Sequence, residues 1–161
     1  MTFEQILEQT SAFSFVPVTY LEDGQDVFHY PDLPFLSKFA ALFLSQLKMT
    51  DQNVQCVLTD ELLLFGLIRV KANGNWIMLG PITSMPCDNQ RAQLILRRYG
   101  LPSSRTGELL SYFGDTPKYS LHKFANLMVY INYVVNRETH NISDLLPEIF
   151  QTGDKSNPLP D

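Results

Sequence analysis

The chain has 161 residues, of which 45% are hydrophobic and 18% are charged, and its formal net charge is -5 at pH 7. These values are typical of one globular domain with a buried core and exclude a disordered chain. An acidic surface repels phosphate backbones, so we do not expect the chain by itself to bind nucleic acid.

Membrane insertion and secretion are also unexpected. The first five residues form neither a basic start nor an apolar run, which argues against a secretory signal. The longest apolar candidate, 121–135, is interrupted by polar residues and is shorter than the roughly 20 residues that span a bilayer. The two cysteines, Cys56 and Cys87, lie far apart in sequence, and we expect them to be free thiols in a cytoplasmic protein.

The first third of the chain predicts a helix, two strands and a second helix. Residues 2–9 have a helical apolar spacing, and residues 13–21 alternate as a strand does. After a turn at 22–24, residues 26–30 return as a second strand, which completes a hairpin. Pro34 then begins a helix, which we infer from apolar residues at helical spacing: Leu36, Phe39, Ala40, Phe43 and Leu47.

The segment from Val54 to Ile82 is the most regular part of the sequence. It predicts three antiparallel strands, 54–59, 62–70 and 76–82, the last two joined by an Asn-Gly turn. The middle strand is apolar at both odd and even positions, which indicates that both of its faces are covered. Its central residue, Gly66, predicts a bulge or a close neighbour on one face, because a side chain is absent there.

The remainder is predicted to be helical. Asp88 caps a helix that ends near Tyr99, a second helix opens at Ser103 or Ser104, and Ser120 caps the longest one, 121–137. Residues 151–161 are polar with two prolines and predict a linker or tail, so residues 1–150 form the predicted domain. The element order predicts an α+β fold: a PAS/GAF-like five-stranded antiparallel sheet flanked by helices, followed by C-terminal helices.

Several short motifs resemble a known family. They are Leu64–Arg69, Trp76–Ile82, Pro86-Cys87-Asp88, Tyr99–Pro102 and Tyr112-Phe113-Gly114. Together they resemble the N-terminal sensor region of AraC-family transcriptional regulators from Gram-positive bacteria, over roughly residues 1 to 150. The resemblance implies a regulatory domain that senses a small molecule or dimerises. It would reach DNA only through a DNA-binding domain that this chain does not contain.

A PAS-like sheet would place one side of its central strands around a small-molecule effector. The candidate pocket residues are Tyr20, Phe28, Cys56, Phe65, Leu67, Trp76 and Met78, with His29 and Tyr30 as further polar groups. The alternative is that these side chains fill the core, because apolar pockets and packed cores have the same composition.

The longest predicted helix suggests a homodimer. One of its faces carries six apolar residues, and Val129, Tyr130 and Tyr133 extend the apolar surface around the side. A helix that is apolar over most of its circumference needs two partners, and a second copy of the chain is the commonest solution. Burial by the helix over 104–113 is the alternative.

Catalytic and metal-binding patterns are weak. His29, His122 and His140 lack the close spacing of metal ligands, so we expect no metal and no cofactor. Cys87 is the better redox candidate of the two cysteines, because a helix entrance can lower the pKa of a thiol. We expect no enzyme. The alternatives to a regulatory domain are a stand-alone oligomerisation module and, more remotely, a small enzyme of unknown type.

Overall fold

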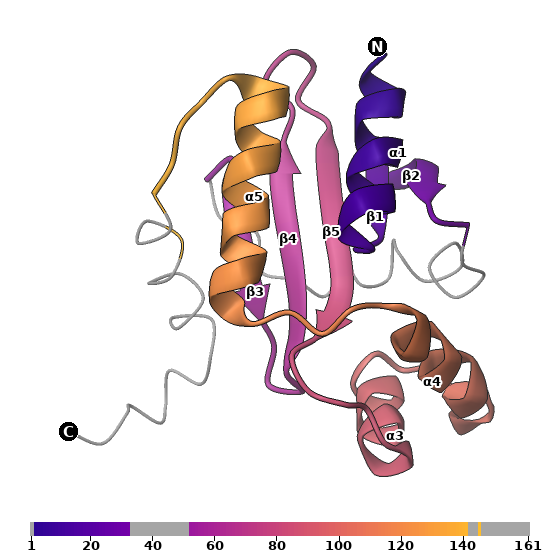
Figure 1. The fold of residues 1–161 in the computed structure, drawn as a ribbon. Helices are drawn as coiled ribbons and strands as arrows, with labels where there is room; N and C mark the ends of the chain where they lie inside the picture. Colours follow the sequence, from indigo (N-terminus) through magenta and orange to yellow (C-terminus); the bar gives the residue numbers. More distant parts are fainter. Residues whose placement is uncertain (1, 33–51, 142–144, 146–161) are drawn as a thin grey trace.

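A five-stranded antiparallel sheet organises the chain in the computed structural model, which describes residues 2–32, 52–141 and 145 (Figure 1). Its strands are β1 (Val18–Glu22), β2 (Gln25–Tyr30), β3 (Val54–Leu58), β4 (Leu63–Arg69) and β5 (Trp76–Thr83). The spatial order is β2-β1-β5-β4-β3. The predicted α+β class and antiparallel sheet are therefore confirmed, while the predicted helix from Pro34 and the predicted tail lie outside the described residues.

Four α-helices are described with the sheet. They are α1 (Phe3–Ser14), α3 (Asn89–Arg98), α4 (Thr106–Asp115) and α5 (Leu121–Asn136), and a 3-10 turn at Ser103–Arg105 precedes α4. Side-chain caps at Thr2, Asp88 and Ser120 begin α1, α3 and α5 by accepting a backbone N–H of the first turn. No helix among these residues is long and apolar enough to cross a bilayer.

The predicted end of the first helix, residue 9, and the predicted start of the first strand, residue 13, are wrong. Helix α1 continues to Ser14, and β1 begins only at Val18. The hydroxyls of Thr10 and Ser14 donate to carbonyls one turn earlier, Ile6 O at 2.8 Å and Thr10 O at 2.6 Å, so they are satisfied inside the helix. Phe15 then ends the helix in the left-handed conformation.

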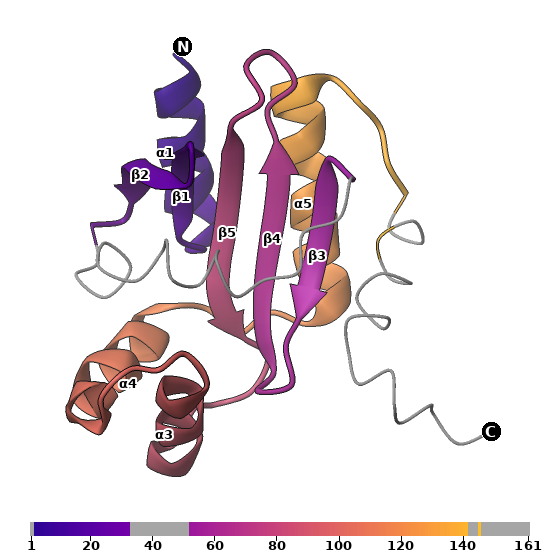
Figure 2. The ribbon, with the colours of Figure 1, turned by 180° about the vertical axis from the view of Figure 1, so that it is seen from behind.

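Helices cover the two faces of the sheet differently. Helices α1 and α5 lie over one face, whereas α3 and α4 lie near the end of the sheet where β5 finishes (Figures 1 and 2). The first face packs a core that includes Leu7, Ile68, Ile77, Phe124 and Met128. The second core joins α3 and α4 to Phe65, Leu67 and Met78. Strand β4 contributes to both cores, which confirms the prediction from its unbroken apolar run.

Two glycines shape the sheet. Gly66 lies opposite α5 with Met128 directly against it, and the β4–β5 register shifts beside it, so both parts of its prediction hold. Gly80 has a φ of +91°, and a Cβ there would lie 2.6 Å from the Leu64 carbonyl oxygen, so only glycine fits. The Gly80-Pro81 pair therefore lies inside β5, which continues to Thr83, one residue beyond the predicted end of the strand.

Candidate functional site

The seven predicted pocket residues do not come together. Tyr20, Cys56 and Phe28 belong to the core beneath α1 and α5. Phe65, Leu67, Met78 and Trp76 belong to the core on the opposite face of the sheet. Because neighbouring side chains on a strand point to opposite faces, these residues cannot line one cavity. The single pocket was a wrong prediction, and the core-filling alternative describes the buried members of the set.

Tyr20 is bound into the structure at both ends of its side chain. Its hydroxyl accepts hydrogen bonds from Asn73 Nδ2 at 2.9 Å and Asn75 Nδ2 at 2.7 Å. Its ring stacks on Phe28 at 5.1 Å and meets Phe3 edge-on at 5.2 Å. These contacts fix the β4–β5 turn against β1, so Tyr20 has a structural role.

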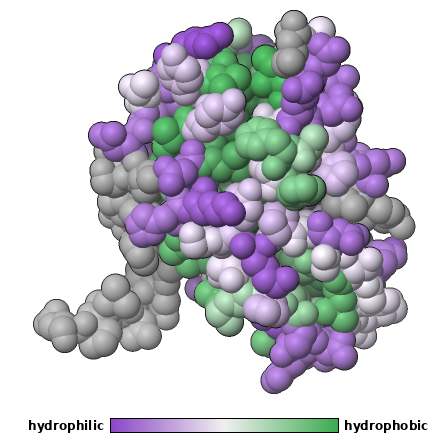
Figure 3. Space-filling model, in the orientation of Figure 1, coloured by the Kyte–Doolittle hydropathy of each residue, from purple (hydrophilic) through white to green (hydrophobic). Residues whose placement is uncertain are grey.

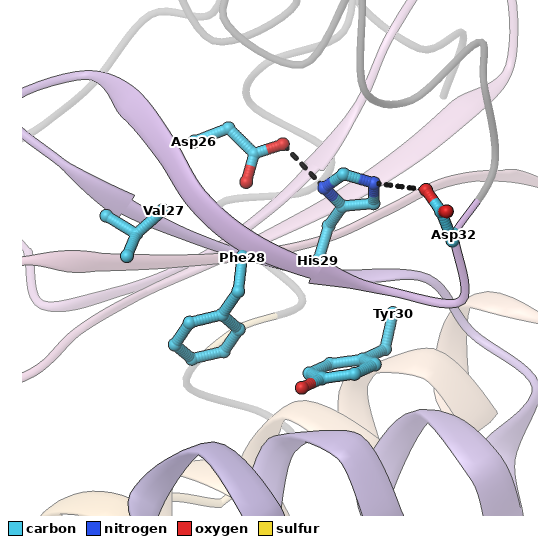
Figure 4. Close-up of a pocket in the computed structure, with 6 residues that line it drawn as sticks. All are labelled: Asp26, Val27, Phe28, His29, Tyr30 and Asp32. Carbon is cyan, nitrogen blue, oxygen red and sulfur yellow. Dashed lines mark hydrogen bonds and ion pairs between the residues drawn. The ribbon is translucent and has the colours of Figure 1, made fainter.

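A hollow of about 390 Å³ lies along the edge strand β2 (Figure 4). It is lined by Asp26, Val27, Phe28, His29, Tyr30 and Asp32. Asp26 and His29 point to one side of the strand, and Phe28 and Tyr30 point to the other, toward a helix (Figure 4). The strand thus separates the pair Asp26 and His29 from the rings of Phe28 and Tyr30.

His29 stands between two carboxylates. Its Nδ1 is 2.7 Å from Asp26 Oδ2, and its Nε2 is 3.2 Å from Asp32 Oδ1. The Nε2 contact with Asp32 has hydrogen-bond geometry, whereas the contact of Nδ1 with Asp26 is a close approach without that geometry. The arrangement fastens the end of β2 to the residues that follow it. The described lining includes no serine, cysteine or threonine that a histidine could activate.

A second hollow, of about 510 Å³, lies between the end of α1 and the first half of α5. We call it the α1–α5 groove, and its lining residues are Phe13, Tyr119, Lys123, Asn126, Leu127 and Tyr130. Phe13 and Tyr130 are 59% and 52% exposed, and their rings meet edge-on with centroids 6.1 Å apart. Exposed hydrophobic side chains gather over the space between α5 and α1 (Figure 3).

The predicted dimer residues divide between the inside and the outside of α5. Val129 is partly buried and packs against the core. Tyr130 and Tyr133 lie one turn apart and point outward, and Tyr133 is 47% exposed. The guanidinium of Arg137 lies 5.9 Å from the centre of the Tyr133 ring. Within the chain, the outward tyrosines are not buried by α4, which instead packs on the other core.

The two cysteines lie in different surroundings, Cys56 in the core and Cys87 at an intermediate depth. Cys56 is a buried thiol that takes part in no disulfide, as expected for a core cysteine. The pKa of the Cys87 thiol is raised, chiefly by burial, although Arg91 acts to lower it. Burial therefore opposes activation of the Cys87 thiol by the helix entrance, and a redox role for Cys87 stays a prediction.

Metal ligation finds no support in the described part of the chain. It contains no group of three or more His, Cys, Asp or Glu side chains placed to hold an ion. His29 lies on β2, His122 lies exposed in the first turn of α5, and His140 follows that helix.

Of the groove lining, the sequence singled out Tyr130, but as a dimer residue and not as part of a pocket. Phe13 was assigned to a strand, and Tyr119 and Lys123 were not considered as site residues. Only the full length of α1 brings Phe13 opposite Tyr130. The available sequence signal was the pair of aromatic residues at the end of α1, Phe13 and Phe15, which a soluble helix exposes only at a cost.

Comparisons with protein-family models, with curated proteins and with solved structures gave no match. Any assignment of function to this chain must therefore rest on its own residues and their arrangement.

Proposed function

We propose that the chain is the regulatory domain of an AraC-like transcriptional regulator, and that it forms a homodimer through the outward face of α5. In this proposal the protein is cytoplasmic, is not an enzyme, and reaches DNA only through a domain outside this chain. The sheet order β2-β1-β5-β4-β3, with helices on both faces, supports a PAS/GAF-like fold. The short motifs that resemble AraC-type sensor regions support the regulatory role.

One observation carries the pairing: aromatic rings stay exposed on α5 above a core that is already filled. Phe124, Met128 and Ile131 satisfy the inward face of the helix, so Tyr130 and Tyr133 are not needed there. Tyrosine is enriched among the residues that dominate binding energy at interfaces. A two-fold dimer would cover the same patch on both copies, which is the commonest form of self-association.

Contacts between α5 and β4 couple the position of the proposed interface helix to the sheet. Asn136 Nδ2 donates to the Arg69 carbonyl at 2.8 Å, and Lys71 N donates to Asn136 Oδ1 at 3.0 Å. Met128 seats on Gly66 two turns earlier. A shift of α5 at the interface therefore moves groups on β4. An effector regulates such a domain only if it binds two arrangements unequally.

Disulfide trapping tests the interface directly. In a Cys87→Ser background, Tyr130→Cys and Tyr133→Cys each place a thiol on the proposed interface. We expect mild oxidation to yield covalent dimers, because residues near a two-fold axis approach their own copies closely enough for a disulfide. Leu94→Cys is the matched control, since Leu94 is an exposed apolar residue on α3. Equal cross-linking at residue 94 and at the tyrosine positions would refute the interface.

The regulator part of the proposal has a separate test. The coding sequence downstream of residue 161 should continue into two helix-turn-helix units. A stop codon directly after residue 161 would instead favour the stand-alone oligomerisation module. The pairing of α5 is common to both, so this test does not affect the interface.

A further inference from the structure

The charge of the α1–α5 groove is positive, although the chain as a whole is acidic. Lys123 is the charged residue among its lining side chains. The Lys123 ammonium lies 4.6 Å from the centre of the Tyr119 ring, and the described residues supply it with no carboxylate partner. Lys123 also stands in the first turn of α5, where the helix dipole adds positive potential. An anion is therefore the complementary partner.

The floor and walls of the groove are apolar and held in place. Tyr119 and Leu127 are mostly buried and form the floor. The Tyr119 hydroxyl donates to the Ser14 carbonyl at 2.7 Å, which ties the start of α5 to the end of α1. Phe13 and Tyr130 provide exposed ring surfaces on either side. A groove fixed in this way loses little freedom when a ligand enters.

The size of the groove suits a small molecule. Its volume of about 510 Å³ falls within the usual range of ligand sites, roughly 300 to 1,000 Å³. Such sites combine apolar walls with a few polar groups that fix orientation, and here these are the Lys123 ammonium and the Asn126 side chain.

We propose that the α1–α5 groove binds a small aromatic carboxylate. The ring of the ligand lies against Phe13 and Tyr130, and its carboxylate lies at Lys123. Tyr130 belongs both to this groove and to the proposed dimer interface, so the bound ligand and the second copy compete for it. This last step rests on the proposed function, whereas binding of the ligand does not.

Three probes of similar size but different charge test the chemistry on the full chain: phenylacetate, its neutral isostere phenylacetamide, and the cation phenethylamine. We expect nuclear magnetic resonance titration to move the Phe13 and Tyr130 signals, and phenylacetate to bind most tightly. Added salt should weaken the binding of phenylacetate and leave that of phenylacetamide unchanged, because exposed ion pairs are screened. Equal or tighter binding of the amine, or no movement of groove signals with any probe, would overturn the proposal.

Variants locate the site. Lys123→Gln should weaken phenylacetate binding by about fivefold, the size expected for an exposed ion pair, and leave phenylacetamide binding unchanged. Lys118→Gln removes the same charge outside the groove lining and should change neither. Phe13→Ser should weaken both ligands. If Lys118→Gln weakens phenylacetate binding as much as Lys123→Gln does, the effect comes only from net charge, and the proposed site is refuted.

The same titration separates this inference from the proposed function. Saturating phenylacetate should raise the dissociation constant of the dimer. If dimers form and phenylacetate does not bind, the groove proposal fails and pairing stands. If phenylacetate binds through Lys123 and the chain is a monomer at every concentration, pairing fails and the ligand site stands. Binding with no change in the dimer constant contradicts the competition at Tyr130.

Discussion

Helix α5 packs directly on the sheet where Met128 lies against Gly66. A Cβ at residue 66 would overlap Met128 Sδ and lie 3.2 Å from Leu79 Cβ. Both neighbours are fully buried, so neither can move into solvent. The absence of a side chain at this one position therefore sets the distance between α5 and β4.

Gly66→Ala should lower the free energy of unfolding by about 1 to 3 kcal/mol, the usual cost of overpacking a core. Urea denaturation measures this loss. The cost should shrink in a Met128→Ala background, because the shortened side chain leaves room for the new methyl group. Gly107→Ala is the control: this glycine lies in α4 with open space around it, so no loss is expected. Strict additivity of the two core changes would show that residues 66 and 128 do not share this contact.

Because of two buried tyrosines, we expect the stability of the folded chain to decrease as the pH rises in the alkaline range. Burial raises the pKa of Tyr112 well above 10, and the Tyr112 hydroxyl donates to the Pro81 carbonyl at 2.8 Å. Burial, with a further contribution from Glu61, raises the pKa of Tyr99 to about 12, against the opposing effect of Arg98.

Since these folded-state pKa values lie above the unfolded value of 10.0, their contribution to stability is complete below pH 10. It is lost as the pH rises toward 12, with a slope of about 1.4 kcal/mol per pH unit for each tyrosine. Urea denaturation between pH 8 and pH 12 should show this fall, and Tyr112→Phe should reduce its slope. An unchanged slope in that variant would mean that Tyr112 ionises alike in both states.

At the scale of elements, the sequence predicts strands better than the length of α1. Strands β3, β4 and β5 follow from their apolar alternation and their Asn-Gly turn. The last two residues of α1, Phe13 and Ser14, were assigned to a strand because apolar and small residues alternate from there to Leu21. The hydroxyls of Thr10 and Ser14 are satisfied within the helix, but that of Ser11 is satisfied only in the folded chain, where it donates to the Tyr30 carbonyl at 3.0 Å. That partner is distant in sequence, so local patterns do not reveal it.

The edge strand β2 depends on His29. Asp26→Asn removes one of the two carboxylates that hold the imidazole, and we expect it to lower the stability of β2 by about 1 kcal/mol. Hydrogen exchange of the β2 amides should become several-fold faster, while exchange in β4 stays unchanged. Asp23→Asn, at the exposed β1–β2 turn, removes the same charge and should leave β2 exchange as it is. Equal effects of the two variants would contradict a role for His29 as a clamp.

At the scale of the whole molecule, the sequence predicts which segments are strands but does not predict which face of the sheet each side chain enters. The five strands and their antiparallel pairing were predicted correctly. The pocket was not, since Tyr20 pairs with Ile77 and places its ring on the α5 face, while Met78 one residue later faces α3 and α4. Register decides which face a side chain enters, and register depends on partners that are remote in sequence. The groove depends on the same long-range arrangement.

Self-association through α5 is the central claim, and sedimentation equilibrium of the full chain measures it most directly. With rising concentration the apparent mass should climb from 18.4 kDa toward twice that value. Combining Tyr130→Ser with Tyr133→Ser should raise the dimer dissociation constant by at least about tenfold, or 1.4 kcal/mol, whereas Leu94→Ser should behave as the unmodified chain does. A mass that stays at 18.4 kDa at every concentration, or a dimer that the tyrosine changes leave intact, would contradict the account.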